Sequence, residues 1–199
     1  MKVFGIDPGS ERTGYGCVDT DGSRHRLVVC GAITTAALDS FPAKLLTIHM
    51  RLTALIGECA PDCVVIESLF HANNVRSALK LGHARGVAVL AAVEAGLPVV
   101  EYTPAEIKRA VVGHGRAEKH QVQHMVKLLL GLAAVPTPHD AADALAIAIC
   151  HVHSMVPARM AGSMPAASAL PRTKAATSWR HYRPASALAA LRRGKPAQS

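Results

Sequence analysis

A short apolar run near the N-terminus, VFGID at residues 3–7, ends in a carboxylate and is followed at once by Pro8 and Gly9. The run has the length and composition of a buried strand, and a Pro-Gly pair marks a turn. An ionised carboxylate at the end of a buried strand is costly unless a partner compensates its charge. Asp7 is therefore either a simple turn cap or a ligand of a cation that is not part of the chain.

Three other carboxylates lie at comparable places. Glu67 ends the apolar run CVVI, and Asp140 and Asp143 open HDAADALAIAI, a segment rich in Ala, Leu and Ile that is typical of a buried helix. Residues three apart share one face of a helix, so Asp140 and Asp143 are expected to face the same way. If the strands that end in Asp7 and Glu67 are parallel neighbours, both carboxylates emerge at one edge of the sheet.

Buried like charges raise one another's pKa, and a divalent cation bound between them removes that conflict. Oxygen ligands without thiolates favour Mg²⁺, with Mn²⁺ as a substitute. A pair of such ions can activate a water and stabilise the departing oxygen of a scissile phosphate. Each acid alone is more simply a turn cap, a partnered strand end or a helix N-terminal acid that complements the dipole. The set as a whole favours a metal site formed by Asp7, Glu67, Asp140 and Asp143.

The remaining pattern predicts an α/β protein. Apolar runs or alternation between turn signals indicate strands at residues 2–7, about 14–19, about 26–34, 63–67 and 97–102. Helical spacing or helix-start signals indicate helices at residues 42–59, 75–95, from 103, about 117–130 and 139–153. Three antiparallel strands followed by alternating strands and helices predict a five-stranded mixed sheet flanked by helices.

Charge and composition divide the chain in two. The protein has 199 residues and a formal net charge of +8, and all of its 14 acidic residues precede residue 151. After about residue 157 the sequence consists largely of Ala, Pro, Ser and Arg with little periodicity. We therefore expect a folded domain at 1–154 and a disordered, basic, Ala/Pro/Arg-rich tail at 155–199. Such a tail either binds an anionic polymer or is a solubilising extension.

The sequence has no apolar stretch of 18 residues and no signal peptide, which predicts a cytoplasmic protein without a membrane partner. Its five cysteines are odd in number and mostly lie in apolar segments. Cys59 and Cys63 lack a second Cys or His pair at zinc-site spacing, so buried free thiols are expected.

Five sequence blocks resemble the successive signature blocks of RuvC-type Holliday-junction resolvases: GIDPGSERTGYG, IESLF, SALKLGHARG, VVGHGRAEKHQVQHMV and HDAADALAIAI. The first block alone is weak, because actin-like ATPases share a similar phosphate loop. All five, in order over about residues 1–153, are specific. The resemblance implies an RNase H-like fold, a homodimer, and paired symmetric nicks in four-way junctions that leave 5′-phosphate and 3′-hydroxyl ends. It also implies that Asp7, Glu67, Asp140 and Asp143 are the catalytic, Mg²⁺-binding acids.

The resemblance extends to basic residues that would contact DNA. Lys108 and Lys119 match positions that the family uses near the scissile phosphate, which gives Lys119 a catalytic role as an electrostatic stabiliser. Arg116 lies in the Gly-rich loop at 113–119, where glycine amides and the start of the following helix could approach a phosphate. The alternative for these residues is a solvated basic surface.

A loop after the fourth strand, SLFHANN, holds a further set of candidate DNA contacts. Phe70 matches an aromatic residue that the family keeps as a junction probe, and such a ring can stack on an unpaired base. Family loops often have Lys where Asn73 stands, so one phosphate contact is either missing or supplied by Arg76. A second basic row on the next helix consists of Arg76, Lys80 and Arg85. The alternatives are a core position for Phe70, a solvated face for the basic row, and a helix cap for Asn74.

Two further features remain open at this point. Paired nicks require two equivalent sites, and the helix with Gly82 and Gly86 is the candidate dimer face, although packing against the sheet predicts the same glycines. His139 stands four residues before Asp143 and is either a metal or phosphate contact or only a helix N-terminal side chain.

The most consistent interpretation is a Mg²⁺-dependent, structure-selective endodeoxyribonuclease of recombination and repair. An RNase H-like nuclease that acts on RNA precursors is the alternative. An actin-like ATPase would need a second phosphate loop, an adenosine motif and a longer chain. A non-cleaving junction-binding module would not need all four acids. A junction branch-migration helicase complex is a candidate partner that the sequence does not identify.

Overall fold

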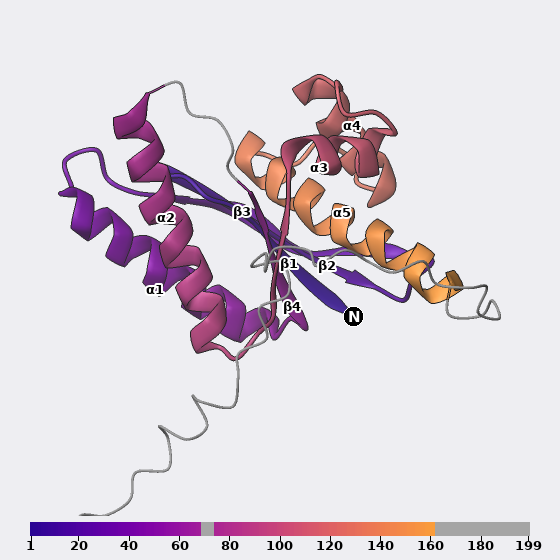
Figure 1. The fold of residues 1–199 in the computed structure, drawn as a ribbon, viewed down its shortest axis with the longest axis horizontal. Coiled ribbons are helices and arrows are strands. Elements are labelled where there is room, and N and C mark those ends of the chain that lie inside the picture. The colour runs from indigo at the N-terminus through magenta and orange to yellow at the C-terminus, as the bar shows by residue number, and fades with distance from the viewer. Residues whose placement is uncertain (69–73, 162–199) are drawn as a thin grey trace, which may run out of the picture.

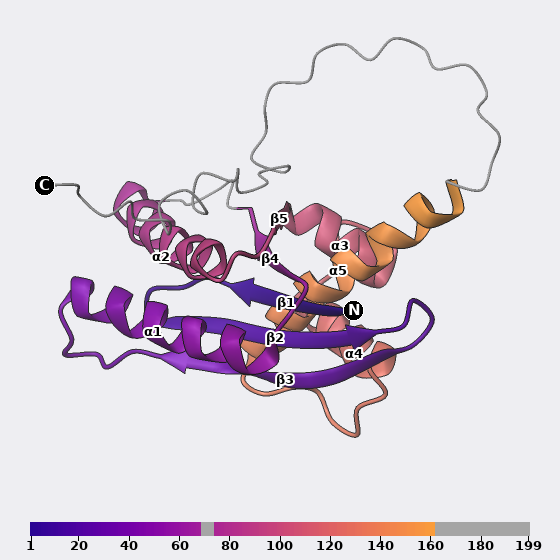
Figure 2. The same ribbon diagram turned by 90° about the horizontal axis from the view of Figure 1, so that it is seen from below.

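The computed structural model describes residues 1–68 and 74–161 (Figure 1). Within them, one mixed sheet has the strand order β3-β2-β1-β4-β5. Its strands are β1 (Lys2–Asp7), β2 (Arg12–Thr20), β3 (His25–Thr34), β4 (Cys63–Glu67) and β5 (Val99–Tyr102). The first three strands form antiparallel hairpins, as Figure 2 shows, whereas β4 and β5 run parallel to β1. The predicted five-stranded mixed sheet is confirmed.

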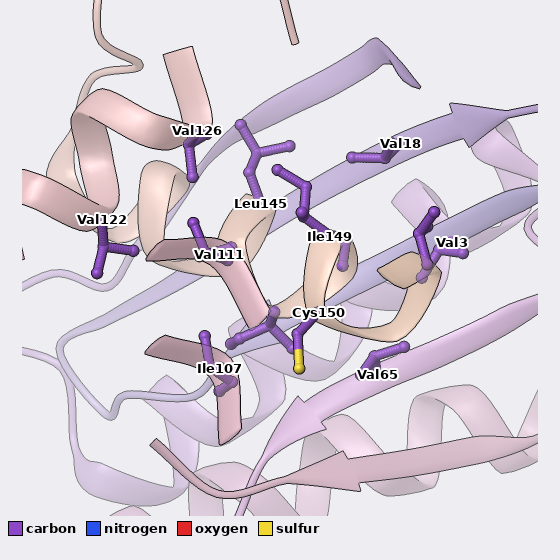
Figure 3. Packing of buried hydrophobic residues seen from close by; sticks show 14 of the residues in the cluster. Val3, Val18, Val65, Ile107, Val111, Val122, Val126, Leu145, Ile149 and Cys150 are labelled. Carbon is purple, nitrogen blue, oxygen red and sulfur yellow. The ribbon is translucent and has the colours of Figure 1, made fainter. Parts of the chain in front are cut away.

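Helices cover both faces of the sheet (Figure 1). The helices of the described residues are α1 (Phe41–Cys59), α2 (Val75–Glu94), α3 (Pro104–Val112), α4 (Lys119–Leu129) and α5 (His139–Ala161). Side chains of α1 and α2 pack with Phe4 and Ile6 on one face, and side chains of α3, α4 and α5 pack with Val3 and Val65 on the other. Successive residues of a strand point to opposite faces, so β1 contributes to both cores. Figure 3 shows the second core, which is centred on α5.

Element boundaries agree with the sequence pattern at most positions. The predicted start of α3 is confirmed, because the Thr103 hydroxyl accepts from the Glu106 amide at 3.3 Å and the Thr103 amide donates to the Glu106 carboxylate at 2.7 Å. Two ends differ from the expectation. α4 begins at Lys119 rather than near 117, and α5 continues to Ala161 rather than ending at about 153. Residues such as Ala and Met beyond Pro157 are strong helix formers, which favours this continuation.

The long helix α5 lies unusually close to β1 and β2. A Cβ added to Gly5 would lie 2.1 Å from the carbonyl oxygen of Ala144, and one added to Gly14 would lie 2.1 Å from that of Asp140. Only glycine permits this approach of helix to sheet. The absence of a Cβ at Gly5 and Gly14 therefore sets the distance between α5 and the sheet.

Two other predictions concern the described residues. No helix among them is long and apolar enough to cross a membrane. The five cysteines are free, and all but Cys30 are buried.

Candidate active site

The carboxylates of Asp7 and Glu67 lie at the same edge of the sheet. β1 and β4 are parallel neighbours, with Ile6 opposite Ile66, so each strand ends one residue later in its acid. Both acidic residues are half-buried, whereas the strand residues before them are buried. The arrangement that the sequence predicted conditionally, two acids emerging from adjacent parallel strands, is present.

The first turn of α5 brings the other two acids to this edge. Gly14 on β2 is the cross-strand partner of Asp7, and Asp140 lies directly over Gly14 because no side chain intervenes. Asp143 follows three residues later on the same helix, also half-buried. The acids therefore come from three elements that are far apart in the sequence and meet at one strand end.

The four acids interact electrostatically. Burial, together with the charges of Glu67, Asp143 and Asp140, raises the pKa of Asp7 from its usual 3.8 to about 7. Burial and the charge of Asp143 likewise raise the pKa of Glu67. Like charges have this effect only when they share a poorly solvated site. Asp7 is the centre of this group, because all three of the other acids act on it.

Two side-chain cations contact the acids directly. Lys119, the first residue of α4, places its Nζ 2.6 Å from Asp143 Oδ2, and this hydrogen bond raises the pKa of Lys119. Arg12, the first residue of β2, places its Nη1 3.4 Å from Asp140 Oδ2. The second contact is looser and more exposed to solvent than an ideal charge-assisted hydrogen bond.

A third cation, Lys108 on α3, lies near enough to Glu67 to offset part of the rise in the pKa of that carboxyl group, as does Lys119. The structure therefore brings Lys108 and Lys119 to the acidic edge, where the sequence analysis expected them. Their roles toward a phosphate remain predictions.

The acidic side chains suit a divalent cation by their chemistry. Their donors are all carboxylate oxygens, which Mg²⁺ and Mn²⁺ prefer, and the raised pKa of Asp7 reports negative charge that the protein compensates only partly. In residues 1–68 and 74–161, no three His, Cys, Asp or Glu side chains already converge as a preformed metal site. Asp140 and Asp143 are instead in ion pairs with Arg12 and Lys119.

The turn between β1 and β2 is fixed by side chains that the sequence analysis did not single out. The Thr13 hydroxyl donates to the Gly9 carbonyl at 2.7 Å, and the Thr35 amide donates to the Glu11 carbonyl at 3.1 Å. The Glu11 carboxylate accepts from Lys44 Nζ at 2.6 Å. This turn directly follows Asp7, so these contacts fix the backbone next to the acidic group.

A signal for Lys44 was present in the sequence. Lys44, Ile48, Leu52 and Ile56 are spaced four apart, and all four are buried on the inner face of α1. A lysine in line with three core residues must meet an acceptor at the end of that face, because a buried ammonium without a partner is costly.

Comparison with known proteins identifies the family. The family model of the crossover junction endodeoxyribonuclease RuvC matches residues 3–151. The chain belongs to the RuvC family. A RuvC of Trichlorobacter lovleyi is 51% identical over 184 residues, which are 92% of this chain and 100% of that protein. A RuvC of Pelobacter propionicus is 52% identical over 184 residues, with the same coverage of both chains.

Solved RuvC structures have the same fold. Thermus thermophilus RuvC superposes with a TM-score of 0.73 at 37% identity, covering 81% of this chain and 97% of that one. T. thermophilus RuvC in complex with a Holliday junction substrate gives a TM-score of 0.72 at 35% identity, covering 80% of this chain and 96% of that one. The RNase H-like fold expected from the sequence resemblance is thereby confirmed for this RuvC-family chain.

The predicted basic row on α2 is shorter than the sequence suggested. Arg76 and Lys80 are exposed in the first turns of α2, and Lys80 Nζ lies 5.9 Å from the centroid of the Phe41 ring. Arg85 forms an ion pair with Glu101 on β5. Arg85 therefore does not belong to a solvent-facing row, which is reduced to Arg76 and Lys80.

The structure describes only some of the other residues that were predicted to contact DNA or metal. Phe70 and Asn73 lie outside the described residues. Asn74 caps α2, since its Oδ1 accepts from the Arg76 amide at 2.8 Å. His139 is the exposed first residue of α5.

The Gly-rich loop differs from the expected open phosphate site. The Gly113 amide donates to the Arg109 carbonyl at 2.9 Å and ends α3 with a φ of 93°, so this amide is already used. Glu118 occupies the N-cap of α4 and places a carboxylate at the positive end of that helix. This carboxylate disfavours a phosphate at the helix start, and the expected phosphate contact there stays a prediction. Arg116 remains exposed in the loop.

The glycines of α2 do not pack against the sheet. A Cβ at Gly82 or Gly86 would have nothing within 4 Å, so core packing is the wrong explanation for them. They instead line a shallow apolar groove of about 430 Å³ between α1 and α2, together with Leu79 and Leu90. Leu79 is 60% exposed and Leu90 is 49% exposed.

Proposed function

We propose that this protein is a structure-selective endodeoxyribonuclease that resolves four-way DNA junctions in recombination and repair. It would cut by paired symmetric nicks that leave 5′-phosphate and 3′-hydroxyl ends. The observation that carries the proposal is the meeting of Asp7, Glu67, Asp140 and Asp143 at one edge of the sheet, where burial and the charges of the other three acids raise the pKa of Asp7 to about 7. Membership of the RuvC family over residues 3–151 supports the substrate, as does the Holliday-junction complex of the T. thermophilus relative.

The four acids would hold Mg²⁺, with Mn²⁺ as a substitute and two ions per site. Bound dications would supply an activated water and charge stabilisation at the leaving oxygen. The chain's own contribution is positional: Asp7 and Glu67 are fixed by their strands, and Asp140 and Asp143 by the close packing of α5. Because Asp140 is paired with Arg12 and Asp143 with Lys119, these two cations would have to release their carboxylates before the four acids could hold a dication together.

Lys119 and Lys108 would act on the scissile phosphate. The Nζ of Lys119 is held at the edge of the acidic group by Asp143, which keeps this ammonium charged. Released from Asp143, this cation would be free to face the scissile phosphate, where it would stabilise the extra negative charge of the transition state. Lys108, near Glu67, would bind a neighbouring phosphate.

The remaining DNA contacts would lie around this centre. Arg76 and Lys80 on α2 and Arg116 between α3 and α4 are exposed cations suited to backbone phosphates. Phe70 would stack on a base at the junction centre, and Asn73 would contact sugar or phosphate.

Two copies of the chain would pair through the groove of α1 and α2. Its apolar residues are exposed, and close packing of helices favours small residues such as Gly82 and Gly86 at the crossing point. A homodimer supplies the two equivalent sites that paired nicks require. A branch-migration helicase complex is the proposed assembly partner, and the cytoplasm is the proposed location.

The decisive experiment compares Asp7→Asn with Asp39→Asn, a control at an exposed acid in the turn before α1. Each protein is incubated in Mg²⁺ with a synthetic four-way junction and with linear duplex of the same sequence, and the nicks are mapped on denaturing gels. Asp7→Asn should bind the junction without nicking it, because a ligand of the metal is lost, while the control should nick normally. Nicking by Asp7→Asn would refute the site, and equal nicking of linear duplex by the wild type would refute junction selectivity.

A further inference from the structure

Arg12 lies beside the acidic group without a role in the reaction described so far. Its backbone is held on both sides. The position of a Cβ on Gly9 would fall 2.2 Å from the Arg12 carbonyl oxygen, so the chain folds tightly back on this residue. The preceding Glu11 is anchored by Lys44, and the following Thr13 is anchored by Gly9. The point from which the Arg12 side chain extends is therefore fixed.

The side chain itself is held loosely. It is 51% exposed, and its partner among residues 1–68 and 74–161, Asp140 Oδ2, lies at 3.4 Å, near the limit of a hydrogen bond. The neighbouring pair of Lys119 and Asp143 is much closer, at 2.6 Å. An ion pair that is exposed and long contributes little to stability, so breaking it is inexpensive. A fixed backbone with a loosely bound guanidinium suits a group that changes partners.

Charge explains what the second partner would be. The four acids face Arg12, Lys108 and Lys119, so the acidic edge is close to neutral while the acids are ionised. Once the acids bind dications, the three side-chain cations lose their counter-charges and the edge becomes positive. The guanidinium of Arg12 cannot lose its proton, and its planar set of donors matches a phosphate.

We propose that Arg12 is a phosphate ligand for the DNA strand, which Asp140 holds in the metal-free protein and releases on taking a dication. This inference rests on the proposed function, since it assumes a DNA substrate and a metal at the four acids. It has two linked consequences. Without DNA, Arg12 competes with the metal for Asp140. With metal, Arg12 strengthens DNA binding. Both effects arise because Arg12 binds either Asp140 or the DNA, so the binding of metal and the binding of DNA are thermodynamically linked.

Three variants separate this exchange from simpler roles. Arg12→Gln removes the charge, and Arg12→Lys keeps it without the two-pronged donor geometry. Arg26→Gln is the matched control, because Arg26 on β3 is an exposed arginine 3.9 Å from a carboxylate, Asp19, away from the acidic group. Far-ultraviolet circular dichroism and urea unfolding should show that all three variants fold like the wild type.

The first measurement is Mn²⁺ affinity of the DNA-free proteins by electron paramagnetic resonance. Arg12→Gln should bind Mn²⁺ about two- to fivefold more tightly than the wild type, the worth of an exposed ion pair, and Arg26→Gln should not change. An unchanged or weaker affinity in Arg12→Gln would overturn the proposal, because Arg12 would then not compete with the metal.

The second measurement is binding of a four-way junction in EDTA and in Ca²⁺, a dication that takes oxygen ligands. In Ca²⁺, Arg12→Gln should bind about tenfold more weakly than the wild type, with Arg12→Lys in between. In EDTA, this loss should be about two- to fivefold smaller, because Arg12 must first leave Asp140, and an exposed ion pair is worth about that factor. An equal loss in both buffers would overturn the exchange in favour of a static contact. If the wild-type protein does not prefer the junction over linear duplex, the proposed function itself is overturned. This outcome is visible in the wild type alone, so it is distinguishable from a failure of the Arg12 proposal.

Discussion

Substituting Gly14 by alanine tests whether the close approach of α5 to the sheet holds the acids together. The added Cβ would lie 2.1 Å from the carbonyl oxygen of Asp140, whereas ordinary contact begins at 3.4 Å. The opposing atom is backbone in a regular helix and cannot swing aside. Relief requires the first turn of α5 to retreat from β2 by roughly 1.3 Å, the difference between these distances. Asp140 and Asp143 move with that turn, while Asp7 stays on its strand.

Two effects of different size should follow. Overpacking of a close contact costs about 1–3 kcal/mol of unfolding free energy. Displacing catalytic groups by about 1 Å lowers a rate about 10²-fold, because alignment of the reacting atoms is lost. Urea unfolding measures the first effect. Single-turnover nicking of a four-way junction at saturating protein measures the second, at a temperature where the variant is fully folded.

Gly57→Ala is the matched control. Gly57 lies inside α1, and a Cβ there would have nothing within 4 Å. The control should unfold at the same or slightly higher urea concentration and nick at the wild-type rate, since alanine is the better helix former. A Gly14→Ala protein that is as stable and as active as this control would refute the claim that the packing height of α5 positions the acids.

Three other expectations concern the Lys44–Glu11 ion pair, the half-buried side chain of His151 and the groove of α1 and α2. Glu11→Gln should lower the unfolding free energy measured in urea, because buried Lys44 loses its charged partner, whereas Lys44→Met should lower it less, because no buried ammonium remains. An equal loss would contradict the inference that Lys44 depends on Glu11. Burial lowers the pKa of His151, so its neutral form stabilises the native state above about pH 6.5 and this contribution falls as the pH drops. His151→Gln should therefore flatten the decline of unfolding free energy between about pH 7 and 5, and an unchanged slope would contradict it. Leu79→Lys should convert a dimer to monomers in sedimentation velocity, whereas Leu128→Lys, at another exposed leucine on α4, should not; a dimeric Leu79→Lys would exclude the groove.

The acids were predictable because each one interrupts a strong local pattern. Asp7 and Glu67 end apolar strands, and Asp140 and Asp143 interrupt a run of Ala, Leu and Ile. The pattern of apolar residues shows where each strand or helix ends. Strands joined by a crossover run parallel, so the ends of β1 and β4 lie at the same edge of the sheet. The sheet was predictable for the same reason, since its strands differ clearly from the helices in period.

Contacts between exposed charges were not predictable in this way. Arg12 and Lys108 reach the acidic edge because of strand register and helix packing, and neither leaves a periodic trace in the sequence. At the start of α4, the glycines before Glu118 suggested an anion site. The residue that caps this helix is itself an anion, which the glycine pattern did not reveal. The end of α5 was missed because Pro157 normally ends a helix, yet the residues after it favour continuation.

The helix that carries Asp140 and Asp143 also contains the longest continuous buried stretch among the residues whose burial the structure describes. From Ala144 to Cys150, every residue of α5 is at most 1% exposed. Amide protons in this stretch should therefore exchange with solvent only when the whole domain opens. The two acids cannot drift apart by local fraying of their helix downstream, so heat inactivation of the enzyme should coincide with melting of the domain rather than precede it.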